Sequence, residues 1–148
     1  MASTNTTWPR TVYLINEVNL AVRTRMERAL RDHDLTVAQY SVMSLLVGKD
    51  GISSAKIARA RRVSPQSMNE QIVALEGRGL VARLGDPDNR RELLVSLTRT
   101  GHDKLKLCDG AVDQIERELF NDLDPATHKG LRTALATLIA TIRRTDEV

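Results

Sequence analysis

Two side-chain amides, those of Gln66 and Asn69, stand three residues apart near the middle of the chain. An amide offers a hydrogen-bond donor and an acceptor side by side, which matches the edge that adenine presents in the major groove of DNA. Arg90 and Arg91 follow further along, in a segment rich in turn-forming residues. A guanidinium group can pair with guanine, or enter the narrow minor groove of A·T-rich DNA. These residue types favour recognition of duplex DNA.

The amides need a helix that presents them outward, and the sequence predicts one that begins at Ser64 and Pro65. A serine caps a helix N-terminus, and a proline suits the first helical position because its missing N–H needs no partner there. Met68, Ile72 and Leu75 recur at helical spacing and form the buried stripe. The opposite face comprises Pro65, Gln66, Asn69, Glu70 and Val73.

The arginines need a projecting tip, and a β-hairpin is predicted over residues 80–97. Residues 80–84 and 93–97 have strand character, and the turn-rich residues 85–91 separate them. This pattern predicts a small hairpin with a basic tip.

Two further helices are predicted before the amides. Thr36 and Gln39 have the spacing of a capping box at the start of a buried helix, and Ser53 or Ser54 caps a short helix after it. A short helix, a tight turn, a capped helix and a hairpin make a winged helix-turn-helix, which the sequence places at about residues 36–98.

Longer amphipathic helices are predicted on both sides, at about residues 11–33 and 99–145. Thr98 caps the first helix of the second stretch, and Asp124 with Pro125 starts the last helix. The predicted fold is therefore a single domain of residues 1–148, mainly α with a small β-hairpin wing. The helix after Thr98 carries a coiled-coil-like seam of Leu105, Cys108, Val112, Ile115 and Leu119.

Charge is unevenly distributed along the chain, whose formal net charge is +3. Residues 53–100 carry nine basic and five acidic groups, whereas residues 101–148 carry seven basic and nine acidic groups. Binding to phosphates needs clustered Lys and Arg, so a basic central third is typical of a nucleic-acid-binding protein. A solvated charged surface is the alternative interpretation of charge alone.

Several other functions find little support in the sequence. No apolar run is long enough to cross a bilayer, and the single cysteine, Cys108, fits a reducing compartment, so we expect a cytoplasmic protein. The sequence has no nucleotide-binding loop, nucleophile elbow or metal-ligand spacing, and its three histidines are scattered. We therefore expect no enzyme activity, no cofactor and no metal site.

Several motifs, in order, resemble the MarR (multiple antibiotic resistance regulator) family of transcription regulators. Residues 35–40 resemble the family's buried helix, which opens with Leu-Thr followed by Gln and an aromatic residue. Residues 75–83 match Leu-Glu-x-x-Gly-Leu-Val-x-Arg at the end of its recognition helix. Residues 86–91 follow its wing pattern Asp-Pro-x-Asp-x-Arg, and residues 97–101 its Leu-Thr-x-x-Gly. The resemblance covers roughly residues 12–142.

The resemblance implies that the recognition helix, the preceding turn and the wing bind DNA. Four positions depart from the family. Asn89 replaces the usual aspartate that orients the wing arginine, Glu70 replaces a residue that is often basic, and Arg61 and Arg62 stand where Leu and Gly are more common. The predicted DNA-binding residues are Arg61, Arg62, Ser64, Pro65, Gln66, Ser67, Asn69, Glu70, Asn89, Arg90 and Arg91.

The resemblance also implies a homodimer formed by the terminal helices, which binds a pseudo-palindromic operator as a repressor and is released by a small aromatic or anionic effector. Two alternatives remain open: a winged-helix module that binds proteins, and a redox-responsive regulator that uses Cys108. Buried packing is the simpler role for that thiol. The effector residues suggested by the resemblance are Tyr13, His33, Tyr40 and Met43, which could equally belong to the core.

Overall fold

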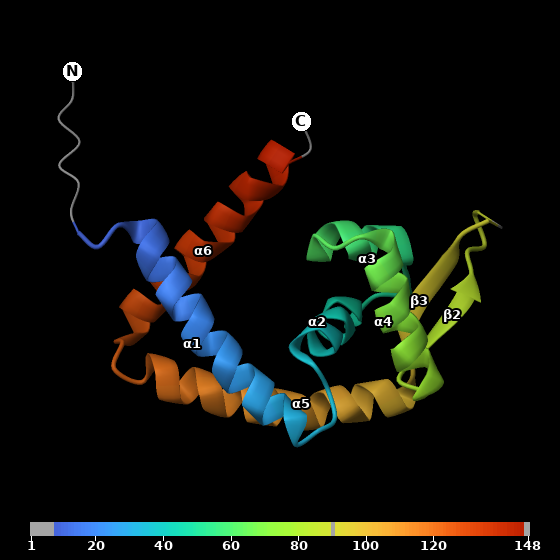
Figure 1. The fold of residues 1–148 in the computed structure, drawn as a ribbon, viewed down its shortest axis with the longest axis horizontal. Coiled ribbons are helices and arrows are strands. Elements are labelled where there is room, and N and C mark those ends of the chain that lie inside the picture. Colours follow the sequence, from blue (N-terminus) through green and yellow to red (C-terminus); the bar gives the residue numbers. More distant parts are fainter. Residues whose placement is uncertain (1–7, 90, 147–148) are drawn as a thin grey trace. The chain divides into compact units, whose positions relative to one another are not determined.

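The structure is a computed structural model that describes residues 8–89 and 91–146 (Figure 1). This part of the chain forms two compact units, one ending at Val112 and the other beginning at Asp113. No helix among the described residues is long and apolar enough to cross a membrane. The elements are α1 (Thr11–Arg31), α2 (Val37–Leu46), β1 (Ile52–Ser53), α3 (Ser54–Arg61), α4 (Pro65–Gly77), β2 (Val81–Gly85), β3 (Leu93–Leu97), α5 (Arg99–Phe120) and α6 (Pro125–Asp146).

The helix starts predicted from the sequence are confirmed at the level of individual hydrogen bonds. Thr36 and Gln39 form the complete capping box of α2. The hydroxyl oxygen of Ser53 accepts from the backbone N–H of Lys56 at 3.4 Å and caps α3. Further along, the Thr98 Oγ1 accepts from the Gly101 N–H at 3.0 Å at the start of α5. Local capping chemistry therefore sets where these helices begin.

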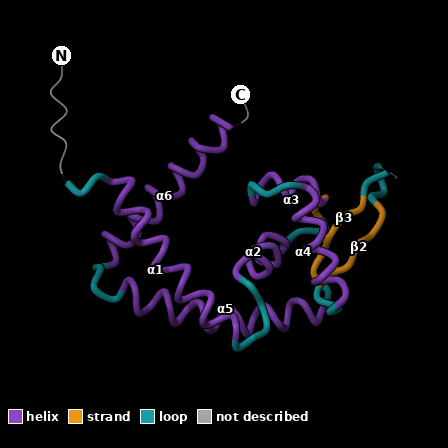
Figure 2. Tube along the Cα trace, in the orientation of Figure 1, coloured by secondary structure: helices purple, strands orange, loops and turns teal. Residues whose placement is uncertain are grey.

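The sheet contains one strand more than the predicted hairpin. β2 and β3 pair antiparallel from Val81 opposite Leu97 to Gly85 opposite Leu93, as expected. The short β1 adds to the other side of β3, with Ile52 opposite Val95, so the strand order is β1-β3-β2. The strands β2 and β3 lie beside α4 (Figure 2). The result is a mainly α fold with a small three-stranded sheet.

Nearly every element of the first unit contributes buried apolar side chains to its core. Leu30 at the end of α1, Met43 in α2 and Ile57 in α3 are fully buried. The predicted stripe of α4 is confirmed, because Met68, Ile72 and Leu75 are each 0% exposed. From α5 the core receives Leu105 and Cys108. This core fixes α4 and the sheet against the rest of the unit, and the side of α4 opposite its buried stripe stays exposed.

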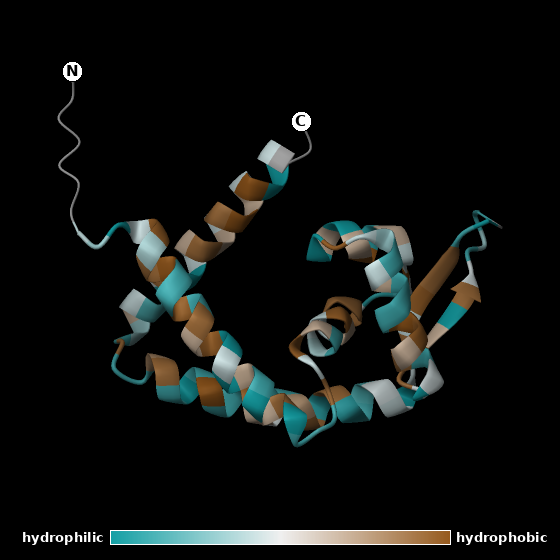
Figure 3. Ribbon diagram, in the orientation of Figure 1, coloured by the Kyte–Doolittle hydropathy of each residue, from teal (hydrophilic) through white to brown (hydrophobic). Residues whose placement is uncertain are grey.

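Apolar residues recur along the terminal helices α1 and α6 (Figure 3), and several of their side chains are exposed in the single chain. In α1, Val18 is 56% exposed. In α6, Leu138 and Ile142 are 45% and 42% exposed. Extended apolar stripes on a soluble chain commonly mark an association surface.

Candidate nucleic-acid interface

The N-terminus of α4 is built by Ser64 and Pro65. The Ser64 Oγ accepts from the backbone N–H of Ser67 at 3.1 Å, and Pro65 occupies the first turn. Both residues are exposed, whereas the Ser67 side chain is half-buried. The first turn of α4 therefore faces outward with its cap in place, as a helix that enters a DNA groove requires.

The predicted reading residues lie on the exposed side of α4. Gln66, Asn69 and Glu70 are all exposed. The Gln66 Nε2 donates to the Glu70 Oε1 at 3.4 Å, at the outer limit of a hydrogen bond. The structure therefore brings two amides and one carboxylate to a single surface, where they can offer both donors and acceptors to base edges.

Arg61 and Arg62 lie at the turn that connects α3 to α4. Arg61 is the last residue of α3, and Arg62 follows as its C-cap with a left-handed backbone at φ 54° and ψ 43°. Both are exposed. This backbone conformation suits glycine better than arginine, because only glycine adopts the left-handed conformation without a steric cost.

We expect Arg62→Gly to raise the free energy of unfolding by about 1 kcal/mol, since it removes the steric cost of a left-handed non-glycine residue. The matched control is Arg61→Gly, which removes the same charge from a helical residue and should lower stability by a similar amount. Urea unfolding of both variants at one protein concentration measures the difference. Equal losses of stability in the two variants would contradict the prediction.

In the loop of the wing, residues 86–89 and 91–92 are held by backbone and side-chain hydrogen bonds. The Asp86 N–H donates to the Glu92 carbonyl at 3.0 Å, which closes the hairpin beyond the last strand pair. The Asp86 Oδ1 accepts from the Asp88 N–H at 2.8 Å, and the Asn89 Oδ1 accepts from the Arg91 N–H at 3.2 Å. Asn89 thus shapes the backbone on which Arg91 is carried, and Arg91 is exposed. Arg90 lies outside the described residues.

Arg83 on β2 is a residue that the sequence interpretation did not single out. Its Nη2 lies 2.6 Å from the Glu76 Oε2 of α4, and its Nη1 donates to the Asn69 Oδ1 at 3.3 Å. The alternating pattern of the strand could have predicted that Arg83 is partly buried. Successive residues alternate in a strand, so Arg83 shares a face with the buried Val81 and needs a partner there.

The residues predicted to bind an effector occupy different environments. Tyr13 on α1 is half exposed, His33 follows α1 and is partly buried, and Met43 is fully buried in the core. The Tyr40 hydroxyl donates to the Asp109 Oδ1 at 2.8 Å, which joins α2 to α5. Burial, and then this hydrogen bond to the carboxylate, raise the pKa of Tyr40 to about 12. Tyr40 is therefore a neutral donor at physiological pH.

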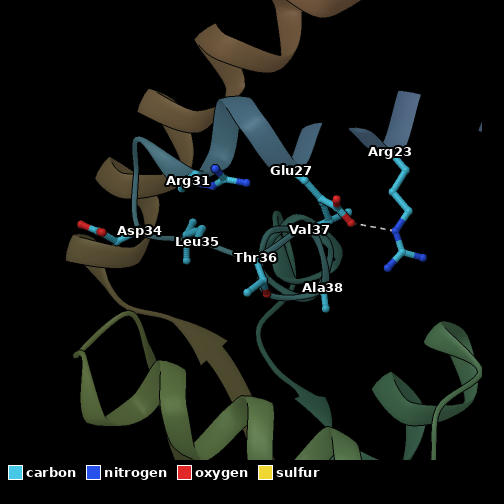
Figure 4. A pocket seen from close by; sticks show the side chains of 8 residues that line it. All are labelled: Arg23, Glu27, Arg31, Asp34, Leu35, Thr36, Val37 and Ala38. Atoms are coloured by element: carbon cyan, nitrogen blue, oxygen red, sulfur yellow. Dashed lines mark hydrogen bonds and ion pairs between the residues drawn. The ribbon is translucent and has the colours of Figure 1, made fainter. Parts of the chain in front are cut away.

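A pocket of about 550 Å³ lies where the end of α1 meets the start of α2 (Figure 4). Arg23 and Glu27 of α1 form an ion pair of 2.8 Å along its wall. Arg31 also lines it, so the pocket carries two guanidinium groups and two carboxylates. The pocket and the four predicted effector residues do not overlap. The described residues that line it are Arg23, Glu27, Arg31, Asp34, Leu35, Thr36, Val37 and Ala38.

Cys108 is buried in the core of the first unit. Burial raises the pKa of its thiol, although Lys104 partly offsets the effect. A redox-sensing cysteine needs an accessible thiolate of lowered pKa, so this environment favours a packing role. Among the described residues there is also no cluster of three or more His, Cys, Asp or Glu side chains suited to a metal ion.

Comparison with known proteins agrees with this geometry. A model of the MarR family matches residues 35–93. The HTH-type transcriptional repressor Rv2887 of Mycobacterium tuberculosis is 33% identical over 126 residues, which cover 85% of this chain and 91% of the repressor. Its crystal structure with p-aminosalicylic acid superposes with a TM-score of 0.71 at 27% identity, covering 86% of this chain and 97% of that one.

A second structure is more similar in fold. A transcriptional regulator of the MarR family from Rhodococcus sp. RHA1 has a TM-score of 0.79 and 26% identity, covering 86% of this chain and 90% of that one. The motifs, the recognition helix with its wing and these similarities therefore agree, and the chain belongs to the MarR family of transcription regulators.

Proposed function

We propose that this regulator binds a pseudo-palindromic DNA operator as a homodimer and represses transcription from a nearby promoter. The observation that carries the proposal is the placement of Gln66, Asn69 and Arg91 on the exposed surfaces of a capped helix and a wing. Amides suit base edges in the major groove, and an arginine at a hairpin tip suits the minor groove. The protein would act by binding alone, without catalysis, in the cytoplasm.

The homodimer is supported by the exposed apolar side chains of the terminal helices. Val12, Leu14 and Val18 of α1 are 72%, 47% and 56% exposed, and α6 exposes Leu135 and Ile139 to 41% and 50%. Covering them with a second copy removes this apolar area from water. A two-fold dimer would place its recognition helices about one DNA turn, roughly 34 Å, apart. Sedimentation as a monomer at micromolar concentration would rule out this arrangement.

Release by a small effector is the proposed regulatory step. Rv2887 has been solved with p-aminosalicylic acid, a small aromatic anion. An effector shifts this protein away from DNA only if it binds the DNA-incompetent conformation more tightly. Tyr13, His33, Tyr40 and Met43 remain the proposed effector residues. Met43 would have to leave the core to contact a ligand, whereas Tyr13 is accessible in this conformation.

A winged-helix module that binds another protein is the second candidate function. Leu84 and Leu93 on the wing are 65% and 50% exposed, which favours a protein surface as partner. The polar side chains of α4 favour DNA. The two functions differ in what they bind, so a direct DNA-binding measurement separates them.

The deciding experiment is selection of the purified full-length protein on random duplex DNA, followed by sequencing and a salt series. We expect enrichment of a pseudo-palindrome whose half-sites are about one helical turn apart, with affinity that falls steeply as salt increases. Weak salt-sensitive binding without sequence enrichment would instead support the protein-binding module.

A further inference from the structure

We propose that Arg83 is a positioning residue that makes Asn69 read guanine in preference to adenine. The inference rests on the proposed function, and it names a specificity determinant within the same DNA-binding surface. One guanidinium group joins two side chains of α4. The Arg83 Nε and Nη2 donate to the Glu76 Oε2 at 3.0 and 2.6 Å, and its Nη1 donates to the Asn69 Oδ1 at 3.3 Å.

Glu76 holds the guanidinium in place. The side chains of Arg83 and Glu76 are 27% and 35% exposed, so their ion pair is partly shielded from water. The hydrogen bond from Arg83 lowers the pKa of the Glu76 carboxyl, which keeps it ionised at neutral pH. A guanidinium is planar and its donors are fixed in direction, so two bonds to one carboxylate oxygen also fix the direction of the remaining N–H groups.

The position of Asn69 follows from helix geometry. It precedes Glu76 by seven residues, which is two turns, so both lie on the side of α4 that β2 approaches. Asn69 lies nearer the N-terminus of α4 and is exposed. The Arg83 guanidinium therefore reaches from a partly buried anchor to the edge of the proposed reading surface.

The contact determines which end of the Asn69 amide faces outward. Arginine only donates hydrogen bonds, so the amide atom that faces Arg83 has to be the oxygen. The NH₂ group of Asn69 then points away from Arg83, and the side chain presents donors. In the major groove, guanine offers the two acceptors N7 and O6, whereas adenine pairs one acceptor with an amino donor. An outward NH₂ group therefore fits guanine and conflicts with the adenine N6 amino group.

Gln66 is held differently. Its Nε2 donates to the Glu70 Oε1 at 3.4 Å, and both side chains are exposed. This orientation directs the Gln66 oxygen outward, and the amide can turn because its partner is an exposed side chain, whereas the partner of Asn69 is a guanidinium held by two hydrogen bonds to Glu76. The two amides of α4 therefore differ in what they present, and Asn69 is the one whose orientation a neighbouring strand enforces.

The test compares four forms of the full-length protein on operator duplexes in which each base pair is varied in turn: unchanged, Asn69→Ala, Arg83→Met and the double variant. Asn69→Ala should remove the preference for one base over the others at one position of each half-site, and that position identifies the base that Asn69 reads. There the unchanged protein should prefer guanine over adenine about fivefold or more. Arg83→Met leaves the Asn69 amide free to turn, so the ratio of affinity for guanine to affinity for adenine should fall to about one or below.

The double variant separates positioning from direct contact, because Arg83→Met should change nothing at that position once Asn69 is alanine. Arg78→Met is the matched control. It removes an exposed arginine that donates to the Asp34 carbonyl at 2.6 Å and should leave the guanine-to-adenine ratio unchanged.

Three results would overturn the inference while leaving the proposed function intact. The first is that the unchanged protein prefers adenine at the base that Asn69 reads. The second is that Asn69→Ala leaves every base preference unaltered. The third is that Arg83→Met still changes the guanine-to-adenine ratio when Asn69 is already alanine. The first needs no substitution of Arg83, so it decides the matter even if Arg83→Met fails to fold. Failure of the unchanged protein to select any operator would refute the proposed function, and this inference with it.

Discussion

Arg91→Ala is expected to weaken operator binding by about one to two orders of magnitude. Arg91 is exposed on the wing, and the Asn89 side chain accepts from its backbone N–H, which shapes the loop that carries it. An arginine inserted into a narrow minor groove contributes both hydrogen bonds and attraction to the enhanced negative potential there. Losing one such side chain from each subunit should also reduce the salt dependence of binding by about two counterions per dimer.

Fluorescence anisotropy with the selected operator, repeated at several salt concentrations, measures both quantities. Arg99→Ala is the matched control, because it removes the same charge from an exposed position at the start of α5. We expect the control to change affinity and salt slope much less than Arg91→Ala does. An Arg91→Ala variant with unchanged affinity and slope would exclude the wing arginine from the DNA interface.

Elements set by local chemistry could be predicted from the sequence. Caps at Thr36, Ser64 and Thr98 act on backbone groups within a few residues, so the sequence alone indicates where those helices begin. β1 could not be predicted in this way. It contains only Ile52 and Ser53, too few residues for an alternating pattern, and it exists because it pairs with β3 far along the chain.

The candidate site shows the same division between local and distant interactions. The sequence predicted which face of α4 is exposed, because Met68, Ile72 and Leu75 define the buried one. It could not show that Arg83 contacts Asn69, since the two residues meet only when β2 packs beside α4. Which atom of an exposed amide faces outward depends on such distant partners, and sequence spacing carries no information about it.

The second large effect is expected at Gly101, where the first turn of α5 packs against the chain leaving α4. The Thr98 N–H donates to the Leu80 carbonyl at 3.2 Å, and the Thr98 Oγ1 donates to the Gly79 carbonyl at 2.6 Å. Gly101 is buried directly beside this junction. A Cβ atom at Gly101 would overlap the Leu80 carbonyl oxygen and lie 3.2 Å from the Leu97 Cδ2.

Gly101→Ala should therefore lower the free energy of unfolding by about 3 kcal/mol or more, and the melting temperature by about 10 °C. The obstruction is backbone, so no side-chain rotation relieves it, and moving α5 away would break the hydrogen bond that Leu80 accepts from Thr98. Gly110→Ala in the same helix is the matched control. A Cβ there meets nothing within 4 Å, and alanine favours helix, so it should raise stability by up to about 1 kcal/mol. Calorimetry of both variants at equal concentration measures the two changes in stability. Changes of opposite sign would support a close backbone approach at Gly101. A stabilised Gly101→Ala variant would instead show that α5 can move off the Leu80 carbonyl at little cost.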